Sequence, residues 1–172
     1  MPSDRGRKGS RLDSFIRRLE AQRACLDWAT AAIADVPGAV LELGLGNGRT
    51  YDHLRSRLAG SRELFAFDRQ VAAHPDCIPD SEHLLVGDFR DTIPAVAAQH
   101  GAGCALVHAD IGSGDQAATA ALARWLGPAL APLLAPGAIV LCDQALEASG
   151  LALQPLPPGV PADRYFIYRF WR

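Results

Sequence analysis

The sequence has few cysteines, almost no lysine and no long uninterrupted apolar segment. Its four cysteines, Cys25, Cys77, Cys104 and Cys142, lack the paired spacing that a zinc site or redox motif requires. We interpret them as small core residues in a reducing compartment. The most apolar later segment, 126–141, contains three prolines, which excludes a membrane span. The basic N-terminus precedes an amphipathic segment and is unlike a signal peptide, so we expect a cytoplasmic protein with no membrane partner.

A strong charge of either sign is also absent. The net charge is -2, which favours neither nucleic acid nor membrane as a partner. The charge is uneven, however, because Met1–Arg23 contains seven basic and three acidic residues, and Lys8 is the only lysine. This basic arm leaves a nucleic-acid or protein substrate open as an alternative.

The length of 172 residues suits one domain, which we assign to residues 1–172. Within it we expect a flexible basic arm over 1–10 and an N-terminal helix over 11–35. A dehydrogenase would need a second domain to hold its substrate, and the chain leaves no residues for one.

The clearest motif lies at residues 40–48, which read Val-Leu-Glu-Leu-Gly-Leu-Gly-Asn-Gly. An apolar strand that runs into a glycine-rich turn is typical of nucleotide sites, because residues without a β-carbon allow backbone N–H groups to approach the ligand. A dinucleotide fingerprint would require a glycine at position 49, where the chain has Arg49. The spacing therefore argues against a dinucleotide.

Two further acids follow the next predicted strands. Segment 63–67 ends at Asp68, which lies 20 positions after Gly48, where a carboxylate can accept hydrogen bonds from both ribose hydroxyls. Segment 83–87 is followed by Asp88. Each acid alone is explained as well by a solvated loop charge or a helix N-cap. Together with Glu42 they end three successive strands, which favours a nucleoside-containing cofactor.

With this acidic-x-Gly-x-Gly-x-Gly motif and these two acids, the chain resembles the class I S-adenosylmethionine-dependent methyltransferases over most of its length. The resemblance implies S-adenosyl-L-methionine as cofactor, with Asp68 on the ribose and Asp88 and Phe89 at the adenine. The cofactor-binding residues predicted in this way are Glu42, Leu43, Gly44, Gly46, Asn47, Gly48, Asp68, Arg69, Gly87, Asp88, Phe89 and Asp110.

The alternation of helical and strand patterns from Gly38 to Asp143 predicts an α/β fold with parallel strands. The resemblance implies a Rossmann-like methyltransferase fold, with a seven-stranded, mostly parallel sheet of order 3-2-1-4-5-7-6 and helices on both faces. The later strands are predicted over 104–109, 138–142, 151–156 and 165–171, the last two as an antiparallel pair. Asp115 should cap a helix that runs to about Leu126, after which Gly127–Pro128 should break or kink it. The resemblance also implies a turn over 134–137, before the next strand.

The N-terminal helix begins at a predicted capping pair of Ser10 and Asp13. An apolar stripe follows at helical spacing, formed by Leu12, Phe15, Ile16, Leu19, Leu26 and Ile33. Trp28 lies off the stripe. It is either ordinary core, or part of a lid over the cofactor, or a contact of a homodimer formed through this helix.

Methyl transfer requires few catalytic side chains, because it is an in-line displacement that depends mainly on the alignment of the acceptor with the methyl donor. Asp110 and His108 are our candidate catalytic residues, although a histidine inside a strand is typical of a satisfied core. Asp110, Asp143 and Gln144 resemble the ligand set of metal-dependent O-methyltransferases, but capping and loop hydrogen bonds explain them equally well. We favour a cofactor without a metal.

The chain has no large insertion between its predicted strands, so few residues outside the cofactor-binding core remain to bind a large acceptor. We therefore expect methyl transfer to oxygen or nitrogen of a small molecule. The alternatives are a nucleic-acid or protein acceptor, and a catalytically silent module that binds S-adenosyl-L-methionine.

Overall fold

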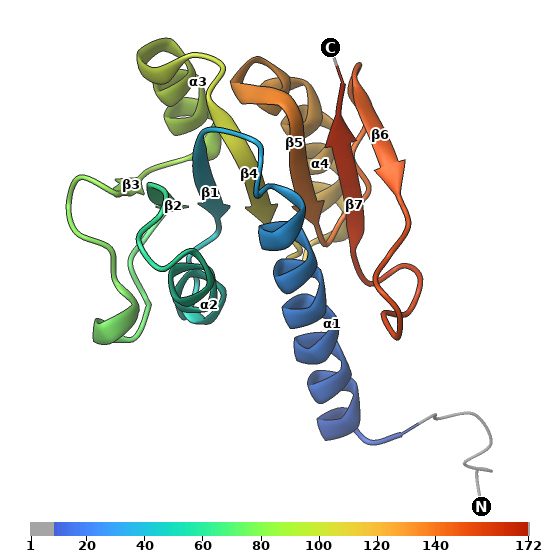
Figure 1. Ribbon diagram of the computed structural model, residues 1–172. Helices are drawn as coiled ribbons and strands as arrows, with labels where there is room; N and C mark the ends of the chain where they lie inside the picture. The colour runs from blue at the N-terminus through green and yellow to red at the C-terminus, as the bar shows by residue number, and fades with distance from the viewer. Residues whose placement is uncertain (1–8, 172) are drawn as a thin grey trace, which may run out of the picture.

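The computed structural model describes residues 9–171, and within them seven strands form one sheet (Figure 1). The strand order is β3-β2-β1-β4-β5-β7-β6, which confirms the predicted fold class and order. Neighbouring strands are parallel except at β7, which is antiparallel to both β5 and β6. The strands are β1 Ala39–Leu43, β2 Leu64–Asp68, β3 Leu84–Val86, β4 Cys104–Ala109, β5 Leu134–Cys142, β6 Leu151–Gln154 and β7 Phe166–Phe170.

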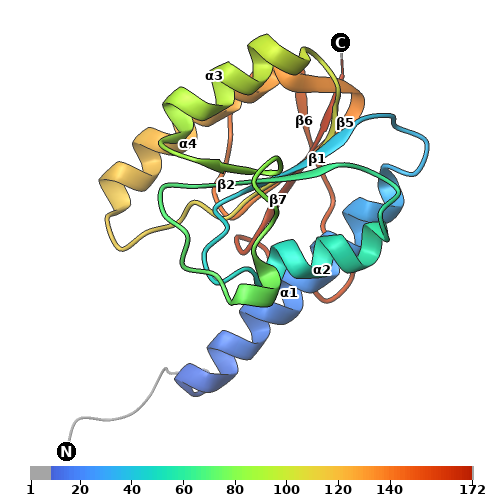
Figure 2. The ribbon, with the colours of Figure 1, turned by 90° about the vertical axis from the view of Figure 1, so that its left-hand side faces the viewer.

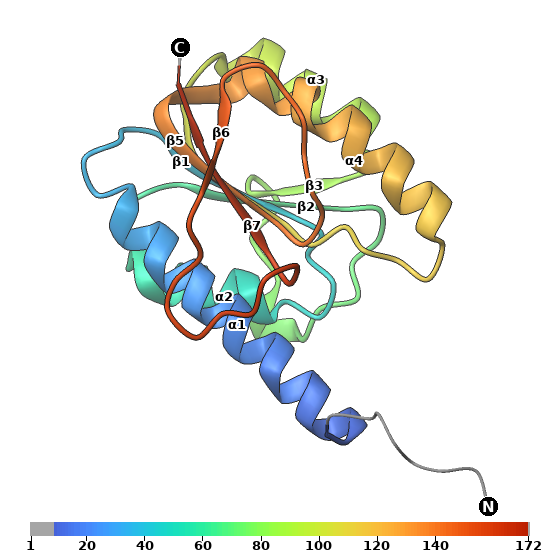
Figure 3. The same cartoon turned by 90° about the vertical axis from the view of Figure 1, so that its right-hand side faces the viewer.

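Helices cover both faces of this sheet, as Figures 2 and 3 show. One face carries α1 (Arg11–Ala32) and α2 (Arg49–Leu58), and the other carries α3 (Phe89–His100) and α4 (Gln116–Leu130). Two short 3-10 helices, η1 (Pro75–Cys77) and η2 (Ala131–Leu133), lie in the connections. Each face has its own buried core, with Leu26 and Leu54 in one and Ile93 and Leu126 in the other. Within residues 9–171, none of the helices combines the length and the apolar composition that a membrane span needs.

The central strands β1 and β4 are buried almost throughout. Parallel strands covered on both faces are expected to be nearly continuous apolar runs, and these two follow that rule with two exceptions. The exceptions are Glu42 in β1 and His108 in β4, which are paired in the parallel register of the two strands. Both side chains are completely buried.

Helix α1 begins with the predicted capping box, in which Ser10 and Asp13 exchange hydrogen bonds. It ends at Ala32, three residues before the predicted end at Asp35. A tertiary contact fixes this end, because the guanidinium of Arg62 donates to four backbone carbonyls that follow the last turn. The predicted position of the helix is therefore correct, and its end was placed too late.

The apolar stripe of α1 is buried only in its second half. Leu26 and Ile33 lie in the core, whereas Leu12, Phe15 and Ile16 are 66 %, 47 % and 43 % exposed. Figures 1 and 3 show the reason, since the first turns of α1 extend past the sheet. Residues 1–8 of the predicted flexible arm lie outside the described residues, and Ser10 of that arm is the helix N-cap.

Helix α4 corrects a second prediction. Asp115 caps it as expected, but the helix continues through Gly127 and Pro128 to Leu130. A β-carbon at position 127 would lie 2.5 Å from the carbonyl oxygen of Glu147. The glycine therefore permits close packing and does not end the helix. The predicted turn at 134–137 is instead the first part of β5, opposite a register shift between Cys104 and Leu106.

The strand predicted over 104–109 matches β4 at both ends. The strands predicted over 83–87, 151–156 and 165–171 were correct in position but too long, because β3 is Leu84–Val86, β6 ends at Gln154 and β7 is Phe166–Phe170. The strand predicted over 63–67 is shifted by one residue, since β2 is Leu64–Asp68. Cys25, Cys104 and Cys142 are buried as predicted, but Cys77 is only half-buried. It lies against the glycine turn, where a β-carbon on Gly48 would be 2.4 Å from that of Cys77.

Candidate functional site

A cavity of about 670 Å³ opens at the carboxyl ends of the central strands, beside α1. This is the place where ligands of doubly wound sheets are expected, next to the point where the strand order reverses. Seven of the predicted residues line it, namely Gly44, Gly46, Asn47, Asp68, Arg69, Phe89 and Asp110. Seven others do not, namely Trp28, Glu42, Leu43, Gly48, Gly87, Asp88 and His108.

The glycine turn after β1 forms one wall of the cavity. Gly44 has φ +93°, and a β-carbon there would lie 2.9 Å from the carbonyl oxygen of Asp110. Gly46 has φ +52°, and a β-carbon on it would meet no atom within 4 Å. The first glycine thus permits close approach of two strand ends, and the second presents bare backbone to the open cavity.

Asp68 is held at the edge of the same turn. Its Oδ2 atom accepts a hydrogen bond from the backbone N–H of Gly46 at 2.8 Å, and Oδ1 accepts a longer one from Gln70 at 3.4 Å. A carboxylate has about four acceptor positions, so Asp68 retains capacity for a ligand's hydroxyl groups. Its place fits the predicted contact with a ribose.

Asp88 has a different environment. It is the N-cap of α3, where Oδ1 accepts from the backbone N–H of Arg90 at 2.9 Å, and Oδ2 lies 3.3 Å from Arg69. Phe89, the next residue, lines the cavity while Asp88 does not. The helix-capping alternative therefore describes Asp88, and its contact with an adenine stays a prediction.

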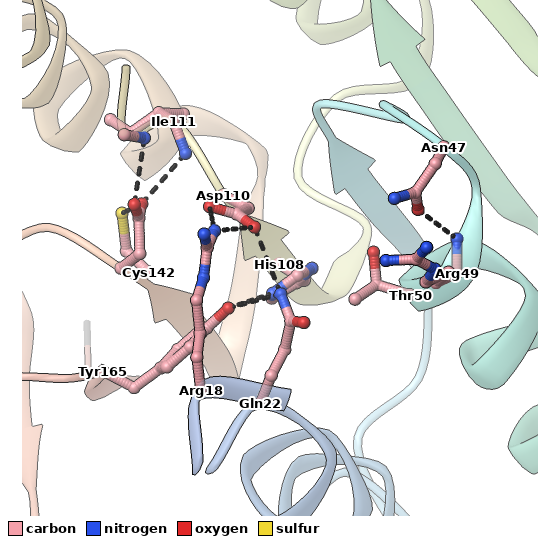
Figure 4. Close-up of polar contacts among 12 residues, drawn as sticks. Arg18, Gln22, Asn47, Arg49, Thr50, His108, Asp110, Ile111, Cys142 and Tyr165 are labelled. Atoms are coloured by element: carbon pink, nitrogen blue, oxygen red, sulfur yellow. Dashed lines mark hydrogen bonds and ion pairs between the residues drawn. The ribbon is translucent and has the colours of Figure 1, made fainter. Parts of the chain in front are cut away.

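Asp110 follows β4 and faces the cavity beneath α1. Figure 4 shows the side chains of Arg18 and Gln22 converging on its carboxylate. One guanidinium nitrogen of Arg18 lies 3.1–3.2 Å from both carboxylate oxygens, and the amide of Gln22 donates to Oδ2 at 3.2 Å. With Leu19, these two residues bring α1 into the cavity wall.

Our reading of the sequence missed Arg18 and Gln22. They are spaced i, i+4 on α1 and so share one helix face, which is the one signal that could have suggested a joint role. Their partner Asp110 lies 92 and 88 residues away, so no local pattern reveals it.

Below the cavity, Glu42 and His108 form a buried pair. Nδ1 of His108 donates to Oε2 of Glu42 at 2.7 Å, and the hydroxyl of Thr50 donates to Oε1. Burial disfavours a charged imidazole, but the adjacent Glu42 outweighs it and raises the pKa of His108. On its other side, Nε2 of His108 lies 3.4 Å from the hydroxyl of Tyr165.

This burial bears on two predictions. His108 has no exposed surface and does not line the cavity, so the satisfied-core alternative describes it in this structure. Glu42 was predicted to bind the cofactor, yet its carboxylate lies under the turn and is used by Thr50 and His108. Its contribution is to hold the turn and α2 together from below.

The predicted metal ligands are also arranged differently. Asp143 accepts hydrogen bonds from the backbone N–H groups of Ile111 and Gly112, each at 2.9 Å, and Gln144 donates to the same carboxylate. Burial, with a contribution from nearby Asp110, raises the pKa of Asp143. Within residues 9–171, no group of three or more His, Cys, Asp or Glu side chains could hold a metal ion. Asp143 thus shapes the loop after β4, as the loop hydrogen-bonding alternative proposed.

Trp28 does not lie over the cavity. It packs, partly buried, against the core between α1 and the sheet. The lid hypothesis for Trp28 is therefore wrong, and the residues of α1 that reach the cavity lie at least six positions earlier.

Comparison with known proteins agrees with this architecture. The model of a family described as S-adenosyl-L-methionine methyltransferase matches residues 9–170. An S-adenosyl-L-methionine methyltransferase from Silicibacter pomeroyi DSS-3 is 45% identical, with a TM-score of 0.89 over 95% of this chain and 99% of that one. No curated protein sequence matches the chain.

More distant structures share the fold alone. TrmN from Thermus thermophilus is 20% identical, with a TM-score of 0.59 over 89% of this chain and 53% of that one. An O-methyltransferase family protein from Burkholderia thailandensis is 14% identical, with a TM-score of 0.56 over 94% of this chain and 58% of that one.

Proposed function

This chain belongs to the S-adenosyl-L-methionine methyltransferase family, and we propose that it methylates an oxygen or nitrogen atom of a small molecule. The observation that carries the proposal is the cavity of about 670 Å³, into which both the glycine turn and Asp110 open. Sites for small molecules range from roughly 300 to 1,000 Å³. One cavity of this size suits the cofactor and a small acceptor together.

In this proposal the cofactor lies along the wall formed by Gly44, Gly46 and Asn47. Asp68 accepts hydrogen bonds from the ribose hydroxyls, and Phe89 packs on the adenine with Arg69 nearby. These residues leave the side of the cavity near Asp110 and α1 for the acceptor.

S-Adenosyl-L-methionine supplies a methyl group that its sulfonium already activates. The protein then has to align the acceptor and exclude competing orientations. Asp110 is the carboxylate of the acceptor side, because Arg18 and Gln22 hold it at the cavity wall. There it can accept a hydrogen bond from the acceptor's O–H or N–H group.

The charge of α1 supports a small acceptor over a nucleic acid. Arg18 belongs to the basic N-terminal segment, yet its guanidinium is paired with Asp110 in the cavity wall. A charge used in this way contributes little to the binding of a polyanion. The protein as a whole has a net charge of -2.

A cytoplasmic location and a homodimer through α1 are further parts of the proposal. Leu12, Phe15 and Ile16 are exposed on the first turns of α1, and such a stripe is typical of helix pairing. The mass of the protein by light scattering tests the dimer.

The function is tested by incubating the protein with cell extract and cofactor labelled in the methyl group. We expect a labelled product of low mass that resists nuclease and protease. A labelled product that nuclease or protease destroys would replace the small molecule by a macromolecular acceptor. Binding of S-adenosylhomocysteine with no labelled product in any extract would favour the silent binding module.

A further inference from the structure

A continuous chain of hydrogen bonds connects the glycine turn to the acceptor side of the cavity. It begins at the buried pair of Glu42 and His108, 2.7 Å apart, and passes from Nε2 of His108 to the hydroxyl of Tyr165 at 3.4 Å. The hydroxyl of Tyr165 accepts from the amide of Gln22 at 2.6 Å, and the same amide donates to Asp110 at 3.2 Å. Figure 4 shows the part from His108 to Asp110.

The chemistry of the glutamine amide makes this chain directional. An amide NH₂ group has two N–H donors in one plane, and in Gln22 one is directed to Tyr165 and the other to Asp110. Fixing the first N–H therefore fixes the direction of the second. Gln22 is 7 % exposed, so water cannot easily replace either partner.

Tyr165 is suited to fix that amide. Burial raises the pKa of its phenol well above the ordinary value, so the hydroxyl stays neutral. The imidazole of His108 is nearly parallel to the phenol ring, at an interplanar angle of 15°. Because His108 is itself fixed by Glu42, the hydroxyl of Tyr165 has little freedom to move.

We propose that Gln22 and Tyr165 are positioning residues for methyl transfer, which hold the Asp110 carboxylate in its orientation toward the acceptor. This inference rests on the proposed role of Asp110 in the function above. Arg18 also contacts Asp110, but its side chain is 49% exposed, and water can take over much of its interaction. The buried amide of Gln22 determines the direction of the carboxylate, and small errors in such a direction reduce rates strongly.

The experiment compares Tyr165→Phe with a matched control, Tyr168→Phe. Tyr168 is also buried, and its hydroxyl also accepts a hydrogen bond, from the backbone N–H of Leu146 at 2.9 Å in the core on the other face of the sheet. Both variants should lose stability, although Tyr165→Phe removes two contacts of its hydroxyl, with Gln22 and with His108. Only Tyr165→Phe should disturb Asp110.

We expect Tyr165→Phe to lower the maximal rate of methyl labelling by about tenfold. This rate is measured with enough extract and cofactor that adding more of either does not increase it. The affinity for S-adenosylhomocysteine and the half-saturating cofactor concentration should remain those of the wild type. Gln22→Leu should have a similar effect, and the double variant should be no worse than either single variant, because the two residues act in series. A rate for Tyr165→Phe equal to that of Tyr168→Phe, per folded molecule, overturns the proposal.

A second measurement does not depend on an acceptor. With ¹³C-labelled aspartate, the carboxyl resonance of Asp110 should shift in Tyr165→Phe and Gln22→Leu and remain in place in Tyr168→Phe. If the wild type binds S-adenosylhomocysteine but labels nothing, the proposed methyl transfer is wrong, and the carboxyl resonance alone then decides whether Gln22 and Tyr165 position Asp110. An unmoved resonance in Tyr165→Phe would then overturn that positioning role.

Discussion

Glu42 of β1 and His108 of β4 are paired in the parallel register of the two central strands, and their side chains are joined at 2.7 Å with no exposed surface. The acid of the glycine motif thus has its partner in the neighbouring strand, beneath the cavity. A buried carboxylate needs such a donor, because an unpaired charge in the core is costly. The pair therefore stabilises the turn from below, and in this structure neither side chain lines the cavity.

The first prediction concerns the pH dependence of stability. The pKa of His108 is raised above its ordinary value of 6.5 by Glu42, despite burial, so the folded protein binds this proton more tightly than the unfolded chain does. The stabilisation is fully present below about pH 6.5 and is lost as the pH rises through the folded-state pKa. The difference in unfolding free energy between wild type and His108→Gln should therefore shrink as the pH rises above about 6.5.

Urea denaturation of both proteins at several pH values measures this difference. Subtracting the unfolding free energy of the variant from that of the wild type at each pH removes the contributions of other titrating groups that the two proteins share. A difference that stays constant or grows with pH would show that His108 is neutral in the folded protein.

A second prediction concerns Asp68. Because its carboxylate borders the cavity and retains acceptor capacity, Asp68→Ala should weaken binding of S-adenosylhomocysteine by at least about tenfold, or roughly 1.5 kcal/mol. Calorimetry provides the measurement, and Asp35→Ala, which removes an exposed acid outside the cavity, is the control. If both variants bind S-adenosylhomocysteine with equal affinity, Asp68 stabilises the glycine turn and does not contact the ribose.

The sequence was sufficient for features that are local or that repeat along the chain. The glycine spacing located the turn, and apolar runs located the strands to within a few residues. Side-chain caps were also readable, because Ser10 and Asp115 act on backbone groups three residues away. These interactions depend on short-range geometry, which sequence spacing encodes directly.

The failures have a common physical origin in contacts between distant segments. The apolar stripe predicts which face of α1 is apolar. It does not predict that the first turns of the helix extend past the sheet and leave Leu12 and Phe15 exposed. The same holds for the close packing of Gly127 on Glu147, in a helix that continues through Pro128 to Leu130. The site itself depends on α1 meeting Asp110, a contact without a local signature.

Arg62 supports a third prediction, which concerns the anchoring of α1. Its guanidinium donates to the carbonyls of Ile33, Ala34, Val36 and Gly38 at 2.5–3.3 Å, and these groups follow the last helical turn. Arg62→Ala would leave them without this donor, and we expect a loss of about 2 kcal/mol. For a domain of this size the melting temperature should fall by roughly 4–8 °C.

Arg124→Ala provides the matched control for Arg62→Ala, because Arg124 is exposed on α4. Its melting temperature should stay within about 2 °C of the wild type. A similar shift in both variants would mean that the carbonyl contacts of Arg62 contribute no more than an ordinary surface arginine.

The final prediction concerns Trp28, whose place in the core contradicts the lid hypothesis. Truncating a large buried aromatic side chain costs about 3–5 kcal/mol, and we expect the lower end for Trp28→Ala because the residue is only partly buried. Stability alone cannot separate packing from ligand binding. The affinity of the folded fraction for S-adenosylhomocysteine, measured at low temperature, can do so and should match the wild type, since Trp28 does not line the cavity. Weaker binding would mean that α1 moves when its second half is loosened, and an unchanged affinity with a halved scattering mass would instead assign Trp28 to a dimer contact.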